Sequence, residues 1–170
     1  ECVAVDPLSV KDLSSWWNIM ADASTTVLVH AGREEVRFCL THSRQVPQNL
    51  IDVQIAQGIV SRSYPLGYSA LIARVLGHDV HGTQTRTDWR VRPLSKKQIR
   101  YALAAVLYVG DVWKQQRKTL ESLGRFEWAQ AEFERMIEEV SAERGEDQWR
   151  RLSGLQKLRR RELAIARALY

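Results

Sequence analysis

Hydrophobic positions repeat with helical spacing in the stretch from residue 99 to about residue 123. Because these apolar side chains fall three or four positions apart, they share one face of the predicted helix. Ser95 is a favourable N-cap residue, and Gln98 three positions later completes a capping box that pairs otherwise unsatisfied backbone groups. We therefore predict one long helix that begins at Ser95, with Gly110 as its weakest point.

The same spacing predicts further helices and the loops between them. The predicted helices cover residues 12–21, 33–42, 50–60, 68–76, 126–143 and 149–170. Gly77 is expected to end the helix before it, and residues 144–147 are expected to separate the last two helices. The segment 78–92 has no periodicity and is polar and basic. Connections of that length in compact domains are commonly functional.

Only two segments have the composition of β-strands, Cys2–Val5 and Thr25–Val29. The second is apolar over its last three residues, so we expect it to be buried on both faces. Two strands separated by a helix cannot form a stable sheet alone. Either the fold is mostly helical or strands are missing from this sequence, and we favour the second because the chain begins within a β run. We expect residues 1–170 alone to fold poorly.

Composition describes an ordinary globular chain. Its 170 residues are 45% hydrophobic and 26% charged, enough for one domain with a core or one domain plus the start of a second. No run of about 18 apolar residues occurs, so no membrane partner is expected, and the first residues do not resemble a signal peptide. The two cysteines, Cys2 and Cys39, are too few for a disulfide framework. A cytoplasmic location is therefore expected, with Cys39 in the core.

Positive charge is concentrated in the middle of the chain. The net charge is +5, but residues 74–118 alone hold 10 basic and 3 acidic side chains. Such a block suits a polyanion such as nucleic acid. Solvated helix faces that happen to be basic explain the block equally well at this point.

Several stretches, in this order and spacing, together resemble the ribonuclease D family of 3′–5′ exoribonucleases, the Asp-Glu-Asp-Asp exonucleases of the tyrosine subtype. They are Val5–Leu8 with Val27–Glu35, Asn49–Ala56 with Tyr64–Tyr68, Thr85–Leu94, and Tyr101–Tyr108. The Thr-Asp-Trp sequence followed by Arg-Pro-Leu is the most specific of them. The agreement extends from Val5 through Leu123. Residues 152–170 are similar to the start of the helicase-and-RNase-D C-terminal (HRDC) domain.

The resemblance implies an α/β, RNase H-like (DnaQ-like) 3′–5′ exonuclease fold, rich in helices, whose first strands are absent from this chain. Residues 1–143 would form a partial exonuclease domain with its trailing helix. Residues 144–170 would form a linker and the first helix of an HRDC-like helical domain. Upstream strands, from the same or another chain, would be needed to complete the sheet.

The resemblance also implies a metal site. In the family, four acidic residues hold two divalent ions, Mg²⁺ or Mn²⁺, against the scissile phosphate, and a tyrosine positions the attacking water. Tyr101 matches the tyrosine, and Glu35 stands at one ligand position where the family usually has Asp. Ala105, four residues after Tyr101 on the same helix face, stands where the fourth acid is expected, and alanine cannot bind a metal. Ala104 removes the nearest substitute, and the family's Asp-x-Glu pair is absent.

The implied partner is RNA with a free 3′ end. The expected phosphate contacts are the basic residues around the most specific motif: Arg86, Arg90, Arg92, Lys96, Lys97 and Arg100. We expect Asp52 and Asp88 to be local caps rather than metal ligands, and His30 to be a turn residue. Trp89 is expected to anchor its loop, with stacking on a base as the alternative.

Two hypotheses share this fold. The first is a 3′–5′ exoribonuclease of ribonuclease D type that processes transfer RNA or other small stable RNAs, although Ala105 and the missing Asp-x-Glu leave this chain short of metal ligands. The second is a catalytically inactive RNA-binding or scaffold module. A third hypothesis is a helical protein-interaction domain unrelated to nucleases.

Overall fold

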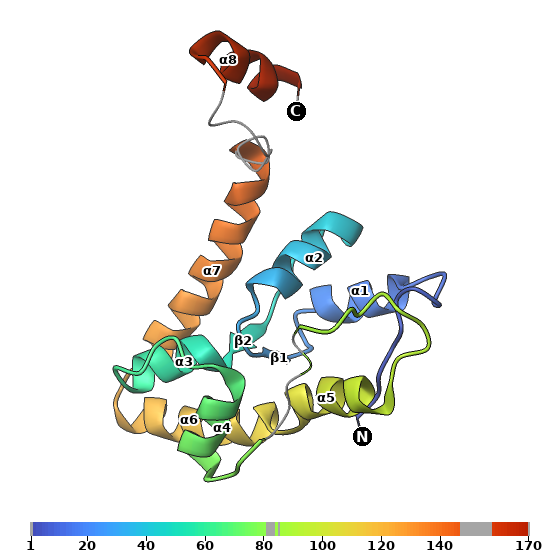
Figure 1. Cartoon of the computed structure of the whole chain (residues 1–170). Coiled ribbons are helices and arrows are strands. Elements are labelled where there is room, and N and C mark those ends of the chain that lie inside the picture. Colours follow the sequence, from blue (N-terminus) through green and yellow to red (C-terminus); the bar gives the residue numbers. More distant parts are fainter. Residues whose placement is uncertain (1, 81–83, 85, 147–157, 170) are drawn as a thin grey trace.

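The computed structural model describes residues 2–80, 84, 86–146 and 158–169. Within these residues the chain forms eight helices and two short strands (Figure 1). In chain order they are α1 (Ser14–Ala21), β1 (Val27–Val29), α2 (Arg33–Ser43), β2 (Leu50–Asp52), α3 (Val53–Val60), α4 (Tyr68–Leu76), α5 (Lys96–Leu107), α6 (Val109–Ser122), α7 (Phe126–Glu146) and α8 (Arg160–Leu169).

The two strands form a small parallel sheet. Val27 of β1 lies opposite Leu50 of β2, and Val29 lies opposite Asp52. Parallel strands need a crossover connection, which α2 supplies. α7 packs against α2, α3 and β2, whereas α6 packs against α3, α4 and β1. In Figure 1 the sheet lies between α2 on one side and the α5–α6 pair on the other.

The main hydrophobic core lies where α3, α4, α6 and α7 meet. Its fully buried members include Val53, Leu71, Val112 and Leu120. A smaller cluster joins α2, β2 and α7 and consists of Val36, Leu50, Met136 and Val140. None of the described residues of α1 or α5 belongs to the buried part of either cluster. These two helices therefore lie at the edge of the packed structure.

The first predicted strand is absent from the structure. Cys2–Val5 is irregular, and Val3 and Val5 are 71% and 55% exposed. A β run needs a neighbour to satisfy its backbone groups, and no described strand lies beside this segment. The second predicted strand is present as the shorter β1. It is partly buried at all three positions rather than buried on both faces, because only one strand pairs with it.

The predicted helix over residues 50–60 is wrong in its first three residues, which form β2. Pairing with β1 overrides the helical spacing of the isoleucines there. The helix begins only at Val53, where the Asp52 side chain caps it. The helices α2 and α4 are close to their predicted bounds, and Gly77 ends α4 in the left-handed conformation, with φ 69°, as predicted.

The long helix predicted from Ser95 is broken at Tyr108 into α5 and α6, rather than weakened at Gly110. At the break, the Tyr68 hydroxyl donates to the Ala104 carbonyl at 2.8 Å and accepts the Tyr108 N–H at 3.3 Å. In an unbroken helix those two backbone groups would bond to each other. A side chain inserted into this ladder is a known cause of a kink.

The C-terminal part differs from prediction at one boundary. α7 continues through Glu146, so the break predicted from residue 144 is wrong over its described part, and residue 147 lies outside the described residues. The strong helix formers before Gly145 carry the helix past it. Of the predicted helix 149–170, residues 149–157 and 170 are not described, and α8 accounts for most of the remainder. Within the described ranges, no helix has the length and apolar character needed to cross a membrane.

Candidate functional site

A buried carboxylate, Asp52, fixes the turn between β1 and α2. Its side chain accepts the N–H groups of Ala31 at 3.1 Å and Gly32 at 2.8 Å, and caps α3 by accepting the Gln54 N–H at 2.8 Å. Ala31 has a φ of 59°, which is costly for a residue with a side chain. At Gly32 a Cβ would lie 2.4 Å from Val29 Cγ2, so glycine is required. Asp52 is thus the predicted local cap, and it also holds the neighbouring turn.

Glu35 lies in the first turn of α2, directly after this turn. Although the residue is exposed overall, desolvation raises the pKa of its carboxyl, and the nearby charges of Asp52 and Glu34 raise it further. An accessible carboxylate with a raised pKa suits the binding of a proton or a cation. Among the described residues, however, no three His, Cys, Asp or Glu side chains are grouped closely enough to hold a metal ion.

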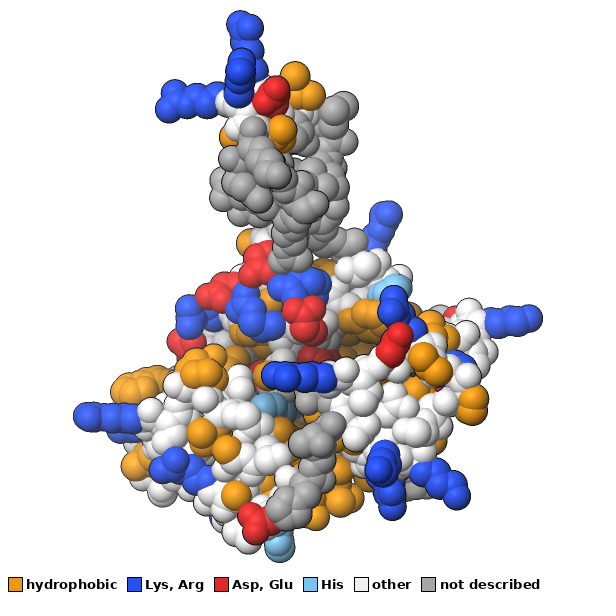
Figure 2. Space-filling view, viewed as in Figure 1, with side chains coloured by type: hydrophobic (Ala, Val, Ile, Leu, Met, Phe, Trp, Pro, Cys, Tyr) orange, Lys and Arg blue, Asp and Glu red, His pale blue; other side chains and the backbone are white. Residues whose placement is uncertain are grey.

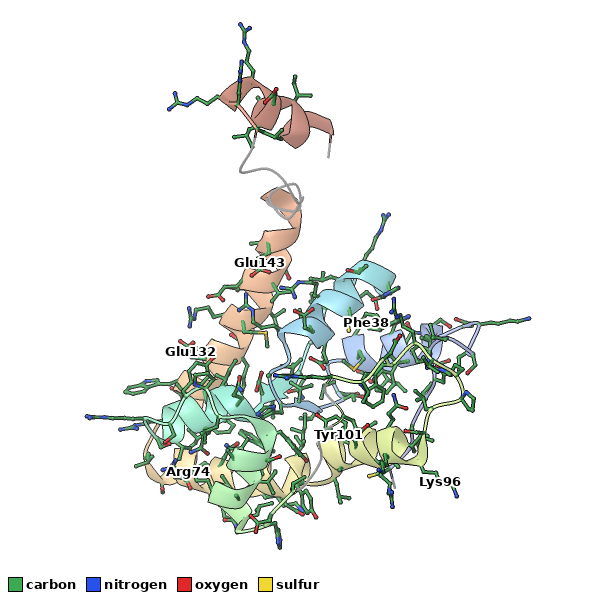
Figure 3. All side chains as sticks on the ribbon, viewed as in Figure 1. Phe38, Arg74, Lys96, Tyr101, Glu132 and Glu143 are labelled. Carbon is green, nitrogen blue, oxygen red and sulfur yellow. The ribbon has the colours of Figure 1, made fainter. Side chains whose placement is uncertain are left out.

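α7 holds α2 from its other side. Arg33 donates to Glu139 at 2.9 Å and to Glu143 at 2.6 Å, and Arg37 donates to Glu143 at 2.8 Å. The two guanidinium groups, Arg37 first, lower the pKa of the Glu143 carboxyl. Figure 3 places Glu143 on the part of α7 that runs alongside α2. The helix that carries Glu35 is therefore fixed at its start by Asp52 and along its length by α7.

The loop before α5 is tied to the first turn of that helix. The predicted capping box is confirmed, since Gln98 Oε1 accepts the Ser95 N–H at 2.9 Å and Ser95 Oγ accepts the Gln98 N–H at 3.2 Å. Gln98 also donates to Thr87 Oγ1 and to the Asp88 carbonyl, both at 3.3 Å. The Trp89 indole N–H donates to a carbonyl of the same loop at 3.1 Å. Trp89 therefore anchors the loop, as expected.

Tyr101 and Ala105 lie four residues apart on α5, as the sequence predicts. Tyr101 is half-buried, and its ring contacts Trp89 with the centroids 6.1 Å apart. Its hydroxyl has no hydrogen-bond partner in the part of the chain that the structure describes. Ala105 is exposed, so a longer side chain could be accommodated there. In Figure 3, Tyr101 lies on the side of α5 that faces the sheet.

The basic residues predicted to contact phosphate differ in what they already bind. Arg92 forms an ion pair with Asp6 at 2.6 Å, which lowers the pKa of Asp6 to about 2. Arg90 pairs with Asp88 at 3.0 Å, and Asp88 accepts the Arg90 N–H as a local cap. The remaining four are exposed and form no ion pair within the described ranges: Arg86, Lys96, Lys97 and Arg100. Lys and Arg side chains project over the start of α5 in Figure 2, where Figure 3 labels Lys96.

Tyr68 connects the β1–α2 turn to α5. His30 is held as a turn residue, because its Nε2 bonds a carbonyl of the α3–α4 loop at 2.9 Å. The His30 ring packs edge-on against Tyr68 with centroids 5.5 Å apart, and the Tyr68 hydroxyl bonds α5 as described above. Among the described residues, no hydrogen bond, ion pair or ring contact joins Glu35 directly to Tyr101. Sequence reasoning missed Tyr68 because its partners lie 36 and 40 residues away, beyond any local pattern.

Comparisons with known proteins show similarity to 3′–5′ exonucleases. The family model of a 3′–5′ exonuclease domain matches residues 1–121. Ribonuclease D of Escherichia coli (strain K12) is 33% identical over 168 residues, which cover 97% of this chain and 44% of that protein. Ribonuclease D of Psychromonas ingrahamii is 31% identical over 166 residues, with 97% and 44% covered. The chain spans less than half the length of these relatives.

Solved structures extend the likeness to the fold. The crystal structure of Escherichia coli RNase D matches with a TM-score of 0.78 and 32% identity, covering 94% of this chain and 43% of that one. Brucella melitensis NrnC with bound Mg²⁺ matches with a TM-score of 0.72 and 21% identity, covering 86% and 71%, a likeness of fold alone. The predicted helix-rich, RNase H-like α/β exonuclease fold is confirmed. A helical interaction domain unrelated to nucleases is excluded.

Proposed function

Because the chain belongs to the ribonuclease D family of 3′–5′ exonucleases, we propose that the whole protein of which it forms part hydrolyses RNA from a free 3′ end. Transfer RNA or other small stable RNAs are the proposed substrates, and the cytoplasm is the proposed location. The observation that carries the proposal is the family match over residues 1–121, which includes every proposed site residue. An HRDC-like domain beginning at residues 144–170 is part of the same proposal.

Three positions define the proposed site. Tyr101 offers a hydroxyl without a protein partner in the described residues, free to orient a water molecule or a phosphate oxygen. Glu35 offers one carboxylate at the start of α2, and Ala105 stands where a further acid is expected. In this family type, Mg²⁺ or Mn²⁺ would supply Lewis-acid stabilisation of the phosphate. One carboxylate does not fit a two-metal site, so the described residues cannot form it alone.

We propose that the missing acids come from strands that pair with the free edge of β1. Within the described residues the sheet has two strands, and β2 pairs with one edge of β1. All three residues of β1 are only partly buried. Added strands, from the same or another chain, would cover such surface and bring carboxylates to the carboxyl end of β1.

RNA binding is assigned first to the four exposed and unpaired basic residues. Lys96, Lys97 and Arg100 lie on one helix, so their charges form a single patch that can follow a phosphate backbone. Arg90 and Arg92 already pair with Asp88 and Asp6, and contact with a phosphate would weaken or break these ion pairs. We therefore expect them to contribute less to RNA binding. Replacing the three α5 residues by Gln should reduce the salt slope of binding by about 2. Lys118→Gln, an exposed position on α6, is the matched control.

The experiment that tests the proposed activity follows a 5′-labelled single-stranded RNA with the whole protein. Shortening from the 3′ end is expected in Mg²⁺ or Mn²⁺ and none in excess chelator. An RNA whose 3′ end is blocked should resist. Shortening that persists in chelator, or cleavage within the strand, would contradict the proposal.

Ala105 favours a second candidate, an inactive RNA-binding or scaffold module on the same fold. It predicts salt-dependent RNA binding with no product under any metal condition. Stepwise products from the whole protein with Ala at position 105 would reject it.

A further inference from the structure

We propose that Tyr68 is a positioning residue that sets where the α5 part of the site stands relative to the α2 part. The proposal rests on the proposed function, because it concerns Tyr101 and the position of Ala105. It goes further in assigning a role to a residue whose hydroxyl touches neither of them. The role follows from three observations on the described residues.

The first observation is the place of the hydroxyl. Tyr68 donates to the Ala104 carbonyl at 2.8 Å and accepts the Tyr108 N–H at 3.3 Å. The hydroxyl therefore lies between the two backbone groups whose mutual hydrogen bond would make α5 and α6 one continuous helix. Tyr108, at the break, has ψ −4°, well away from the helical value. The direction of α5 relative to α6 thus depends on one side-chain oxygen.

The second observation is that Tyr68 is itself held by the other half of the site. Its ring packs edge-on against His30, which directly follows β1 in the turn that leads into α2. The carbonyl of Leu66, two residues before Tyr68, accepts from His30 at 2.9 Å and from Gln54 of α3 at 2.8 Å. Desolvation also raises the pKa of the Tyr68 hydroxyl, so it stays a neutral donor at physiological pH.

The third observation is how little else holds α5. Among the described helices and strands, α6, which follows it directly in the chain, is the one element with more than marginal contact to α5. The loop before it binds the first turn of α5 through Gln98 and the N-terminal segment through Asp6, but neither contact reaches α2. The contacts through Tyr68 therefore form a direct route, among the described contacts, from the turn preceding Glu35 to the end of the helix that carries Tyr101.

The substitution Tyr68→Phe separates this role from simple packing. It keeps the ring against His30 and removes only the oxygen. The Tyr108 N–H can then bond the Ala104 carbonyl directly, which would straighten the α5–α6 pair and move α5. Tyr64→Phe is the matched control, because that ring is 59% exposed and its hydroxyl makes no hydrogen bond within the described residues.

The experiment measures distances between spin labels in a Cys2→Ser background, in which Cys39 is buried and unlabelled. One pair of labels, on cysteines introduced at Thr41 and Val106, measures the distance between α2 and α5. A second pair, on cysteines introduced at Lys97 and Lys118, measures the distance between the two ends of the α5–α6 pair. We expect Tyr68→Phe to shift or broaden the first distance distribution and to lengthen the second. The control should match the parent.

Distances that are unchanged in Tyr68→Phe, even with a lowered melting temperature, would overturn the proposal and leave Tyr68 a packing residue. The measurement needs neither RNA nor metal, so its outcome is independent of turnover. If the distances change while the whole protein never shortens RNA, the proposed function fails and the positioning role stands.

Discussion

The half of the molecule around α3, α4, α6 and α7 is closely packed, whereas α1 and α5 lie open. Leu71 and Leu120 have no exposed surface. Trp16 of α1 and Val106 of α5, by contrast, are 49% and 56% exposed. Taken together, the helices α1 and α5 are no less apolar in sequence than the packed helices, so the difference lies in what is available to pack against. The first half is complete within this chain, and the second is covered on one side only.

This difference bears on function because the proposed site lies across the two halves. Glu35 stands on α2, which Asp52 and α7 hold rigidly, and Tyr101 stands on the open helix α5. Elements that bind ligands are commonly drawn from the less stable part of a fold. The packed half therefore acts as the support, and the open helix α5 carries Tyr101 and the position, Ala105, where the proposed site lacks an acid.

The largest expected effect is on the free energy of unfolding, in a comparison of one residue from the packed helices with one from α5. Leu71→Ala should lower the free energy of unfolding by about 3 kcal/mol, because it leaves a cavity in the core. Ile99→Ala, on the exposed face of α5, should cost less than about 1 kcal/mol. Urea unfolding of both variants measures the difference. Equal costs would mean that α5 is as well covered as the core, contrary to the comparison.

A second pair of variants sharpens the strand proposal. If added strands cover β1, Val27→Ala in that partly buried strand should lower the free energy of unfolding more in the whole protein than in residues 1–170. The cost of Leu71→Ala should be the same in both proteins. A Val27→Ala cost that is also the same in both would argue against covering strands.

A smaller effect is expected at the junction of the halves. Asp52→Ala should lower the free energy of unfolding by about 2 kcal/mol, since several backbone N–H groups lose their buried acceptor. Amide exchange at Ala31 and Gly32 should also become faster. Asp79→Ala, at an exposed position, is the control and should change neither quantity. Unchanged exchange in Asp52→Ala would mean that the turn holds its conformation without this carboxylate.

The smallest effect concerns Glu35 and pH. A carboxyl whose pKa is raised in the folded state binds its proton more tightly there, so its contribution to stability is lost as the pH rises through that pKa. Glu35→Gln should therefore be more stable than the parent at pH 7, by about 0.5 kcal/mol or less at this exposed site. The gain should vanish near pH 4. Melting temperatures across this range measure it, and a gain that does not vary with pH would exclude desolvation of the carboxyl as the cause.

Local patterns in the sequence predict much of the helical framework but less of the candidate site. The capping box at Ser95 and the end of α4 at Gly77 depend on neighbouring residues, and both are confirmed. The strand β2 was missed because pairing with β1, not local spacing, decides its conformation. The break at Tyr108 was missed for the same reason, since Tyr68 causes it from 40 residues away.

The roles of Glu35, Tyr101 and Ala105 came from family resemblance rather than from any physical pattern in the residues. Spacing placed Tyr101 and Ala105 on one helix face, which the structure confirms. It could not relate that face to Glu35, because the connection runs through His30 and Tyr68.

The proposed site depends above all on Ala105 standing at an acid position of a nuclease. The most direct test compares decay of a 5′-labelled RNA by the whole protein with Ala at 105 and with Ala105→Asp, at equal protein and Mn²⁺ concentrations. We expect both proteins to shorten the RNA from its 3′ end, the Asp variant about 100-fold faster, because a transition-state-stabilising group is supplied. Equal rates in the two proteins, with both folded, would contradict it.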